Sequence, residues 1–211
     1  MLHGGIVQFN SYLNKIFSQP TKINLLRFLV KNKPEMTGRE LARFCKISHT
    51  QVYRILNDFE AQGIVKKSSV GGANLYVLNE KNILVTEVLY SLFQKEKVLL
   101  ELILKRLLSK VENKLLSVVI YGSVAEKRER PISDVDVFLL IKNKKMENSL
   151  KHVLPDIEIK FYEQTGNRLS PVVLSIEEIG EKTKTNKTLI SNIFSGKVIM
   201  GRPPKEFVYG K

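Results

Sequence analysis

Two short apolar runs near the middle of the chain constrain its fold more than any other feature. Residues 118–121 read Val-Val-Ile-Tyr, and residues 135–141 read Val-Asp-Val-Phe-Leu-Leu-Ile. Runs of this length that are rich in β-branched residues are typical of strands buried on both faces of a sheet. Gly122-Ser123 directly follows the first run, where we expect the strand to end and a short helix to begin. The pattern therefore predicts a sheet with helices on its faces, in an α/β or α+β domain.

Two acids, Asp134 and Asp136, add a chemical signal at the start of the second run. Residues two apart on a strand point to the same face, with their Cα atoms about 7 Å apart. Two such carboxylates repel each other unless a cation lies between them, and Mg²⁺ is the usual cation where phosphates are bound. A glycine lets a bound group approach the backbone, and amides at a helix start can hold phosphate. We therefore expect the Gly122-Ser123 turn and the two acids to bind phosphate and Mg²⁺; the alternative is a purely structural turn followed by an acidic strand end.

The spacing of Gly122-Ser123, ten residues, and then Asp134-x-Asp136 resembles the signature of the nucleotidyltransferase superfamily. This family shares its fold with DNA polymerase β and the aminoglycoside nucleotidyltransferases, and the resemblance spans roughly residues 84–205. Further positions that carry residues similar to those of small family members are Ala125, Glu129, Arg130, Pro131 and Ser133. One position departs from the pattern, because this chain has Lys127 where a glycine is common after the serine.

The resemblance implies a mixed sheet flanked by helices and a site that uses Mg²⁺. By this likeness Asp134 and Asp136 bind the metal, and Gly122 and Ser123 hold the β- and γ-phosphates of a nucleoside triphosphate. The implied reaction transfers a nucleoside monophosphate to a hydroxyl acceptor, and AMP is the group that we expect to be transferred. That acceptor is a protein side chain in related antitoxins that modify a partner toxin, and a small molecule is the alternative.

Residues 147–165 decide whether a third catalytic acid is present, because the resemblance implies a general base on a strand beside Asp-x-Asp. A strand over residues 157–161 would alternate Ile-Glu-Ile-Lys-Phe and place Glu158 in that position. A helix over 147–165 would make 168–174 the neighbouring strand, which contains no acid. We favour the helix, so Glu158 is a catalytic candidate only under the strand interpretation. Enzymatic activity is then open, and the alternative is an inactive, nucleotide-sensing transcriptional regulator.

The first eighty residues show three helical patterns and a hairpin. A Thr37–Glu40 pair fits a capping box, and Ser48 fits the N-cap of the third helix. We expect Leu41, Ala42 and Phe44 to face the core. The expected bounds are a short helix or arm within 1–20 ending at Pro20, a helix from Thr21 to before Pro34, a helix from Thr37 to the turn at Cys45, a helix from His49 to about Gln62, and strands 64–69 and 74–78 around Gly71-Gly72.

This order resembles the winged helix-turn-helix of many prokaryotic transcription regulators. The resemblance implies that helix 49–62 enters the major groove of double-stranded DNA. We expect Gln51 and Arg54 to reach base edges, and Thr50 and Tyr53 to contact phosphate. The remaining candidate DNA-binding residues are His49 on the same helix, Arg39 and Arg43 on the second helix, and Lys66 and Lys67 on the hairpin. The alternative is a protein-binding or dimerisation module.

Charge favours a polyanionic partner, since the chain has 34 basic and 21 acidic residues and a formal charge of +13. We divide it into a DNA-binding domain (1–80), a helical connector (81–113) and a nucleotidyltransferase-like domain (114–211). The apolar face over 98–108 is too wide for one sheet to cover, which suggests a homodimer. A single cysteine and the lack of a signal peptide or a long apolar run predict a cytoplasmic protein without a disulfide or membrane span. The tail from Pro203-Pro204 is expected to be loose.

Overall fold

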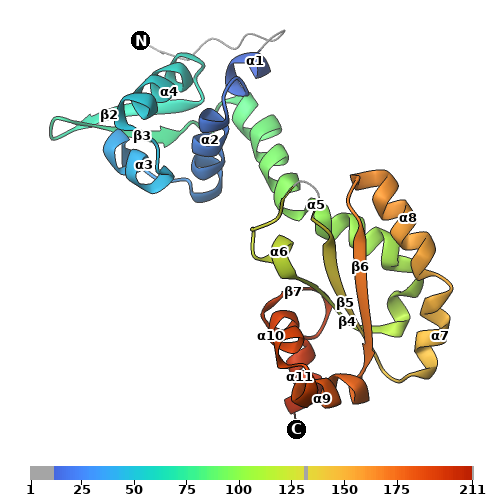
Figure 1. The fold of residues 1–211 in the computed structure, drawn as a ribbon. Coiled ribbons are helices and arrows are strands. Elements are labelled where there is room, and N and C mark those ends of the chain that lie inside the picture. The colour runs from blue at the N-terminus through green and yellow to red at the C-terminus, as the bar shows by residue number, and fades with distance from the viewer. Residues whose placement is uncertain (1–11, 131–132, 211) are drawn as a thin grey trace. The chain divides into compact units, whose positions relative to one another are not determined.

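The computed structural model describes residues 12–130 and 133–210, and it divides the chain into two compact units, residues 1–98 and 99–211 (Figure 1). Each unit has its own hydrophobic core. The boundary between the units falls within one long helix, α5 (Tyr90–Leu108). No helix in the described part of the chain is long and apolar enough to cross a membrane.

The first unit combines helices with a small three-stranded sheet. Its sheet has the order β1-β3-β2, and all its strand pairs are antiparallel. The elements are α1 (Tyr12–Ile16), α2 (Pro20–Asn32), β1 (Met36–Thr37), α3 (Gly38–Cys45), α4 (His49–Ala61), β2 (Val65–Val70) and β3 (Ala73–Leu78). The predicted helices and hairpin are thus confirmed, apart from Pro20, which begins α2 instead of ending the preceding segment. Residues 1–11 of the predicted arm lie outside the described part.

Local side-chain signals fix where the helices of this unit begin. The Thr37 hydroxyl accepts a hydrogen bond from the Glu40 amide at 3.3 Å, and the Glu40 carboxylate accepts one from the Thr37 amide at 2.8 Å. The Ser48 hydroxyl accepts from the Gln51 amide at the start of α4. These bonds satisfy amides that the first helical turn leaves without partners, which is why the caps could be read from the sequence.

One predicted core residue of this unit is exposed. Leu41 and Ala42 are buried as expected, whereas Phe44 is 54% exposed. Its ring stacks on Phe28 with the centroids 6.1 Å apart, and the Arg43 guanidinium lies 5.4 Å from its centroid. The expectation that Phe44 faces the core was therefore wrong, because α3 turns Leu41 and Ala42 inward and leaves Phe44 at its edge.

Residues 84–114 are helical throughout, as a π-helical turn η1 (Leu84–Leu89), helix α5 and a 3-10 turn η2 (Ser109–Lys114). In the first unit, Arg27 donates two hydrogen bonds to the Glu96 carboxylate, at 2.7 and 2.8 Å. In the second unit, Leu104 and Leu108 are buried, while Leu99 and Leu102 are 56% and 53% exposed. The sheet of the second unit therefore covers only part of the apolar surface of 98–108.

The second unit is built on a mixed four-stranded sheet with the order β6-β5-β4-β7. β4 pairs antiparallel with β5 and β7, whereas β5 and β6 are parallel. The strands are β4 (Leu115–Tyr121), β5 (Val135–Ile141), β6 (Leu169–Ser175) and β7 (Lys197–Gly201). The helices are α6 (Gly122–Ala125), α7 (Lys145–Lys151), α8 (Leu154–Thr165), α9 (Ile176–Thr185), α10 (Lys187–Ser195) and α11 (Pro204–Tyr209).

Helices cover both faces of this sheet, as the apolar runs predicted (Figure 1). On one face, Val137 and Leu139 pack with Ile157 and Phe161 of α8. On the other face, Phe138 and Leu140 pack with residues of α9 and α10, chiefly Ile179, Ile190 and Ile193. Successive residues of β5 thus alternate between the two cores. Asp136 therefore lies on the same face of the sheet as Phe138 and Leu140.

Residues 147–165 and the C-terminal tail are both helical. Residues 147–165 lie in α7 and α8, so the helix interpretation is confirmed and the strand interpretation of 157–161 was wrong. Pro155 stands in the first turn of α8, where a missing amide hydrogen costs nothing. The tail that we expected to be loose forms α11, with Phe207 under the Arg202 guanidinium at 5.0 Å, so that expectation was also wrong.

Candidate nucleotide site and nucleic-acid interface

The Gly122-Ser123 turn lies directly beside the acidic strand. Tyr121, the last residue of β4, is the register partner of Asp136 on β5. Gly122 has a φ of +71°, and a Cβ on this residue would lie 2.2 Å from Asp136 Oδ2. Only glycine combines this backbone conformation with such a close approach to the carboxylate. The turn and the acid are therefore fitted to each other.

The two acids form an uncompensated negative pair. Asp134 is exposed just before β5, and Asp136 is half-buried on the strand. Burial raises the pKa of the Asp136 carboxyl, and the nearby Asp134 charge raises it further. The pKa of the neighbouring Tyr121 phenol is also raised, by burial and then by the Asp136 charge. A bound cation would relieve this repulsion.

The donor set fits a metal that takes few protein ligands. Mg²⁺ commonly uses one or two carboxylates and completes its shell with phosphate oxygens and water. Within the described residues, no group of three or more His, Cys, Asp or Glu side chains is placed to hold a metal ion. The Asp134–Asp136 pair could therefore hold Mg²⁺ only together with a ligand such as a polyphosphate.

The strand beside Asp136 contains no acid. Asp136 is the register partner of Ser170 on β6, and Phe138 is the partner of Val172. Val172 packs in the same core as Phe138, so Ser170 lies on the same face of the sheet as Asp136. Glu158 instead belongs to α8, whose Ile157 packs on the opposite face. The conditional assignment of Glu158 as a general base is therefore corrected, because its segment is not the neighbouring strand.

The backbone just after the short helix α6 adopts a left-handed conformation at Lys127. The carbonyl of Ser123 accepts the Arg128 amide at 2.8 Å, which closes the turn after α6. Lys127 has a φ of +56°, in the left-handed region that favours glycine. Lysine thus adopts here a backbone conformation that glycine adopts more easily.

A small cleft adjoins the Gly122 turn and includes residues that the sequence did not single out. Its volume is about 180 Å³. It is lined by Gly122, Ala125, Glu126, Asn192, Ser195, Gly196 and Lys197. Asn192 and Ser195 are one turn apart on α10, far from the motif in the chain, and no local signal could have placed them here.

We expect Gly122→Ala to remove Mg²⁺-dependent nucleotide binding while leaving both acids in the chain. The added Cβ would displace the Asp136 carboxylate, because this side-chain end is easier to move than backbone. Left-handed strain should cost about 1–2 kcal/mol of stability. Titration of Mg²⁺ and ATP, followed by thermal unfolding, measures both effects.

Gly166→Ala is the matched control for this substitution. Gly166 has a φ of +74° in the same unit, but a Cβ there would meet nothing within 4 Å. It should lose similar stability and keep nucleotide binding. Equal nucleotide binding by Gly122→Ala and the wild-type protein would show that the Gly122–Asp136 contact is irrelevant to the site.

The structure separates the candidate DNA-binding residues of α4 into two groups. His49, Thr50 and Arg54 are exposed. The Gln51 amide nitrogen donates to Thr21 Oγ1 at 3.1 Å, which ties this side chain to α2. Tyr53 is half-buried, with its ring 6.4 Å from Tyr76. Gln51 and Tyr53 therefore do not extend freely into solvent, as the contacts expected of them with base edges and phosphate would require.

The remaining cationic candidates are exposed. Arg39 and Arg43 lie on α3, and Lys66 and Lys67 lie on β2 of the hairpin. Their exposure leaves all four charges available at the surface of the first unit.

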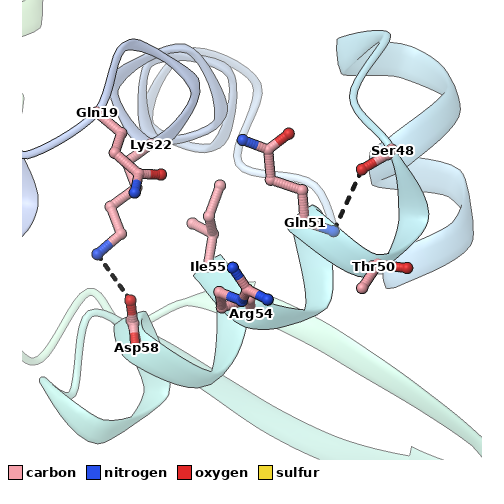
Figure 2. A pocket seen from close by; sticks show the side chains of 8 residues that line it. All are labelled: Gln19, Lys22, Ser48, Thr50, Gln51, Arg54, Ile55 and Asp58. Carbon is pink, nitrogen blue, oxygen red and sulfur yellow. Dashed lines mark hydrogen bonds and ion pairs between the residues drawn. The ribbon is translucent and has the colours of Figure 1, made fainter.

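A second cleft, of about 310 Å³, lies between the start of α2 and α4 (Figure 2). Lys22 is only 8% exposed, and its ammonium contacts Asp58 Oδ2 at 2.7 Å. The lining residues are Gln19, Lys22, Ser48, Thr50, Gln51, Arg54, Ile55 and Asp58. Sequence reasoning missed Gln19, Lys22 and Asp58, because only the packing of α2 on α4 brings them together.

Known proteins match each part of the chain separately. The MarR family model matches residues 19–73, and the model described as "Polymerase beta, Nucleotidyltransferase" matches residues 103–205. No curated protein matches the chain. A similar solved structure is titled "Crystal structure of the predicted DNA-binding transcriptional regulator from E. coli". It is 21% identical over 44% of this chain and 90% of that one, with a TM-score of 0.35.

The two family matches coincide with the folds described above. Residues 19–73 contain α2, α3, α4 and β2, and residues 103–205 contain the mixed sheet with the Gly-Ser turn and both acids. The first part of the chain is therefore similar to the MarR family, and the second part is similar to polymerase beta nucleotidyltransferases.

Proposed function

We propose that this protein is a DNA-binding regulator whose nucleotidyltransferase domain binds a Mg²⁺–nucleoside triphosphate as a ligand. The observation that carries this proposal is the pairing of Asp136 with Ser170, because it leaves the strand beside the two acids without a carboxylate. The site thus has groups for holding metal and phosphate and lacks the usual group for activating an acceptor hydroxyl.

Nucleotide binding is supported by three features of the second unit. Gly122 brings the backbone against Asp136, and α6 begins at this turn. Asp134 and Asp136 supply the two carboxylates that Mg²⁺ would need beside phosphate oxygens. Gly122 and Ser123 would then hold the β- and γ-phosphates. The raised pKa of Asp136 supports this assignment, because it reflects a negative pair that a cation would neutralise.

Transfer of a nucleoside monophosphate is the second candidate function. It is supported by the family match over residues 103–205 and by both acids of the motif. Loss of a general base typically reduces a rate by about 10²–10⁴-fold. Residual transfer of AMP to a hydroxyl, such as that of a protein side chain, would therefore be slow unless the acceptor brings its own base.

Binding of double-stranded DNA is supported by the MarR-family match and by the exposed cations of the first unit. His49, Thr50 and Arg54 are exposed on α4, and Lys66 and Lys67 are exposed on β2 of the hairpin. The exposed Leu99 and Leu102 on α5 support a homodimer, which would suit a module that reads two half-sites.

The proposal is tested by comparing nucleotide binding with nucleotide transfer. Mg²⁺ and ATP together should raise the melting temperature of the full chain more than either does alone. Labelled ATP should give little or no labelled protein when the chain is incubated alone or with a cell lysate. Rapid labelling of an acceptor would favour nucleotide transfer over nucleotide sensing. An unchanged melting temperature at millimolar Mg²⁺–ATP would rule out both functions.

A further inference from the structure

Arg54 faces the cleft between α2 and α4 instead of standing alone on the outer surface of α4 (Figure 2). Its side chain is exposed. Among residues 12–130 and 133–210, it has no hydrogen bond or ion pair. Its guanidinium is therefore free to bind a ligand in this cleft.

The other charges of the cleft cancel each other. The Lys22 ammonium contacts Asp58 Oδ2 at 2.7 Å and donates to the Lys15 carbonyl at 3.2 Å. This pair neutralises the carboxylate that lines the cleft. Arg54 then leaves the cleft with one uncompensated positive charge.

Polar groups at the edge of the cleft match an anion with oxygen acceptors. Thr50, one turn before Arg54 on α4, and Gln19, at the start of α2, both line the cleft, and their side chains carry a hydroxyl and an amide. The Gln19 side chain makes no capping bond to its own helix. Gln51, between them, is held by Thr21 and serves to fix α2 against α4.

We propose that this cleft binds one phosphodiester group of a DNA backbone and that Arg54 is its main ligand. A phosphodiester carries one negative charge, which equals the uncompensated charge of the cleft. The planar guanidinium can donate two parallel hydrogen bonds to two phosphate oxygens. Contacts of this kind position a protein on DNA and carry no sequence information. Arg54 thus anchors α4 on the DNA backbone, in place of the contact with base edges that the sequence suggested.

This inference rests on the DNA binding proposed above and adds a definite role for one residue. The test uses the full chain and a mixed-sequence duplex, with the dissociation constant measured over a range of salt concentrations. Each phosphate contact contributes about 0.9 to the slope of log K against log salt. Arg54→Ala should therefore lower the slope by about 0.9 and weaken binding roughly three- to tenfold at low salt.

Two further variants separate this site from a general effect of charge. Lys31→Ala removes the same charge at the opposite end of α2, where Lys31 is exposed, and should change the slope much less. Gln19→Glu places a carboxylate in the cleft at the N-terminus of α2. A negative charge there should preserve or raise the melting temperature and still weaken DNA binding, because it repels phosphate.

An unchanged slope for Arg54→Ala, an equal loss for Lys31→Ala, or a loss confined to one base pair of a preferred sequence would overturn the phosphate role. A melting-temperature rise with inorganic phosphate in the wild-type protein, absent in Arg54→Ala, would mean that the cleft takes free phosphate instead of duplex. If the wild-type chain does not bind DNA even at low salt, the proposed function itself fails. Equal melting temperatures for Arg54→Ala and the wild-type protein establish that the variant is folded.

Discussion

Changing Asp134 and Asp136 together to asparagine should abolish the Mg²⁺-dependent part of nucleotide binding. Both negative charges would be lost, while the volume and planar shape of each side chain remain. A ligand at 100 times its dissociation constant stabilises a protein by about 2.7 kcal/mol, and this contribution should disappear. Thermal unfolding of both proteins with ATP, with and without Mg²⁺, measures the difference. Equal shifts in the two proteins would remove the metal assignment.

The same substitution should stabilise the protein in the absence of ligand at neutral pH. Burial and the Asp134 charge raise the pKa of Asp136 above its ordinary value, so the folded state binds this proton more tightly than the unfolded state. The associated stability is present below the unfolded pKa and is lost as pH rises through the folded pKa. The variant should therefore be more stable than the wild-type protein at pH 7, and this advantage should vanish in acid. A wild-type protein that is the more stable of the two at pH 7 would contradict this account.

Gly201→Ala should destabilise the second unit by at least about 3 kcal/mol. Gly201 has a φ of +73°, and a Cβ on it would lie 2.0 Å from the Leu116 carbonyl oxygen and 2.8 Å from the carbonyl carbon. These atoms are backbone atoms of β4, where Ser117 is the register partner of Gly201. Neither strand can move without breaking the sheet, so both the overlap and the strain remain. Urea unfolding measures the loss.

Gly180→Ala is the matched control, because a Cβ there meets nothing within 4 Å. Gly180 lies inside α9, where alanine is favoured over glycine by about 0.8–1.0 kcal/mol. This variant should therefore be more stable than the wild-type protein. A Gly201→Ala variant as stable as the wild-type protein would mean that β4 and β7 do not approach as closely as the structure indicates.

The sequence by itself determined the features that depend on neighbouring residues. The Thr37–Glu40 box and the Ser48 cap could be read directly, because each hydrogen bond joins residues three apart. The Gly122-Ser123 turn could also be read from the sequence, because it directly follows an apolar run, but the close approach of Asp136 to Gly122 is a contact across the sheet. The strands around the turn were also evident, because a strand buried on both faces is apolar without interruption.

The tertiary structure alone decided which residues face one another across elements. Residues 157–161 alternate as a strand would, but burial of Ile157 and Phe161 against one face of the sheet makes them part of α8. This packing leaves Ser170, in place of Glu158, beside Asp136.

The same limit applied to the winged helix and to the tail. Helical periodicity predicts that Gln51 is exposed. In the structure, α2 packs close to α4, and the side-chain amide of Gln51 donates to the Thr21 hydroxyl on α2. The tail forms α11, in which Phe207 lies under Arg202 and packs against the core that contains Ile190. The packing against this core joins separate segments, and no local pattern encodes it. Secondary structure and motif thus follow from short-range hydrogen bonds and periodicity, whereas the composition of each site depends on long-range packing, which a single sequence does not reveal.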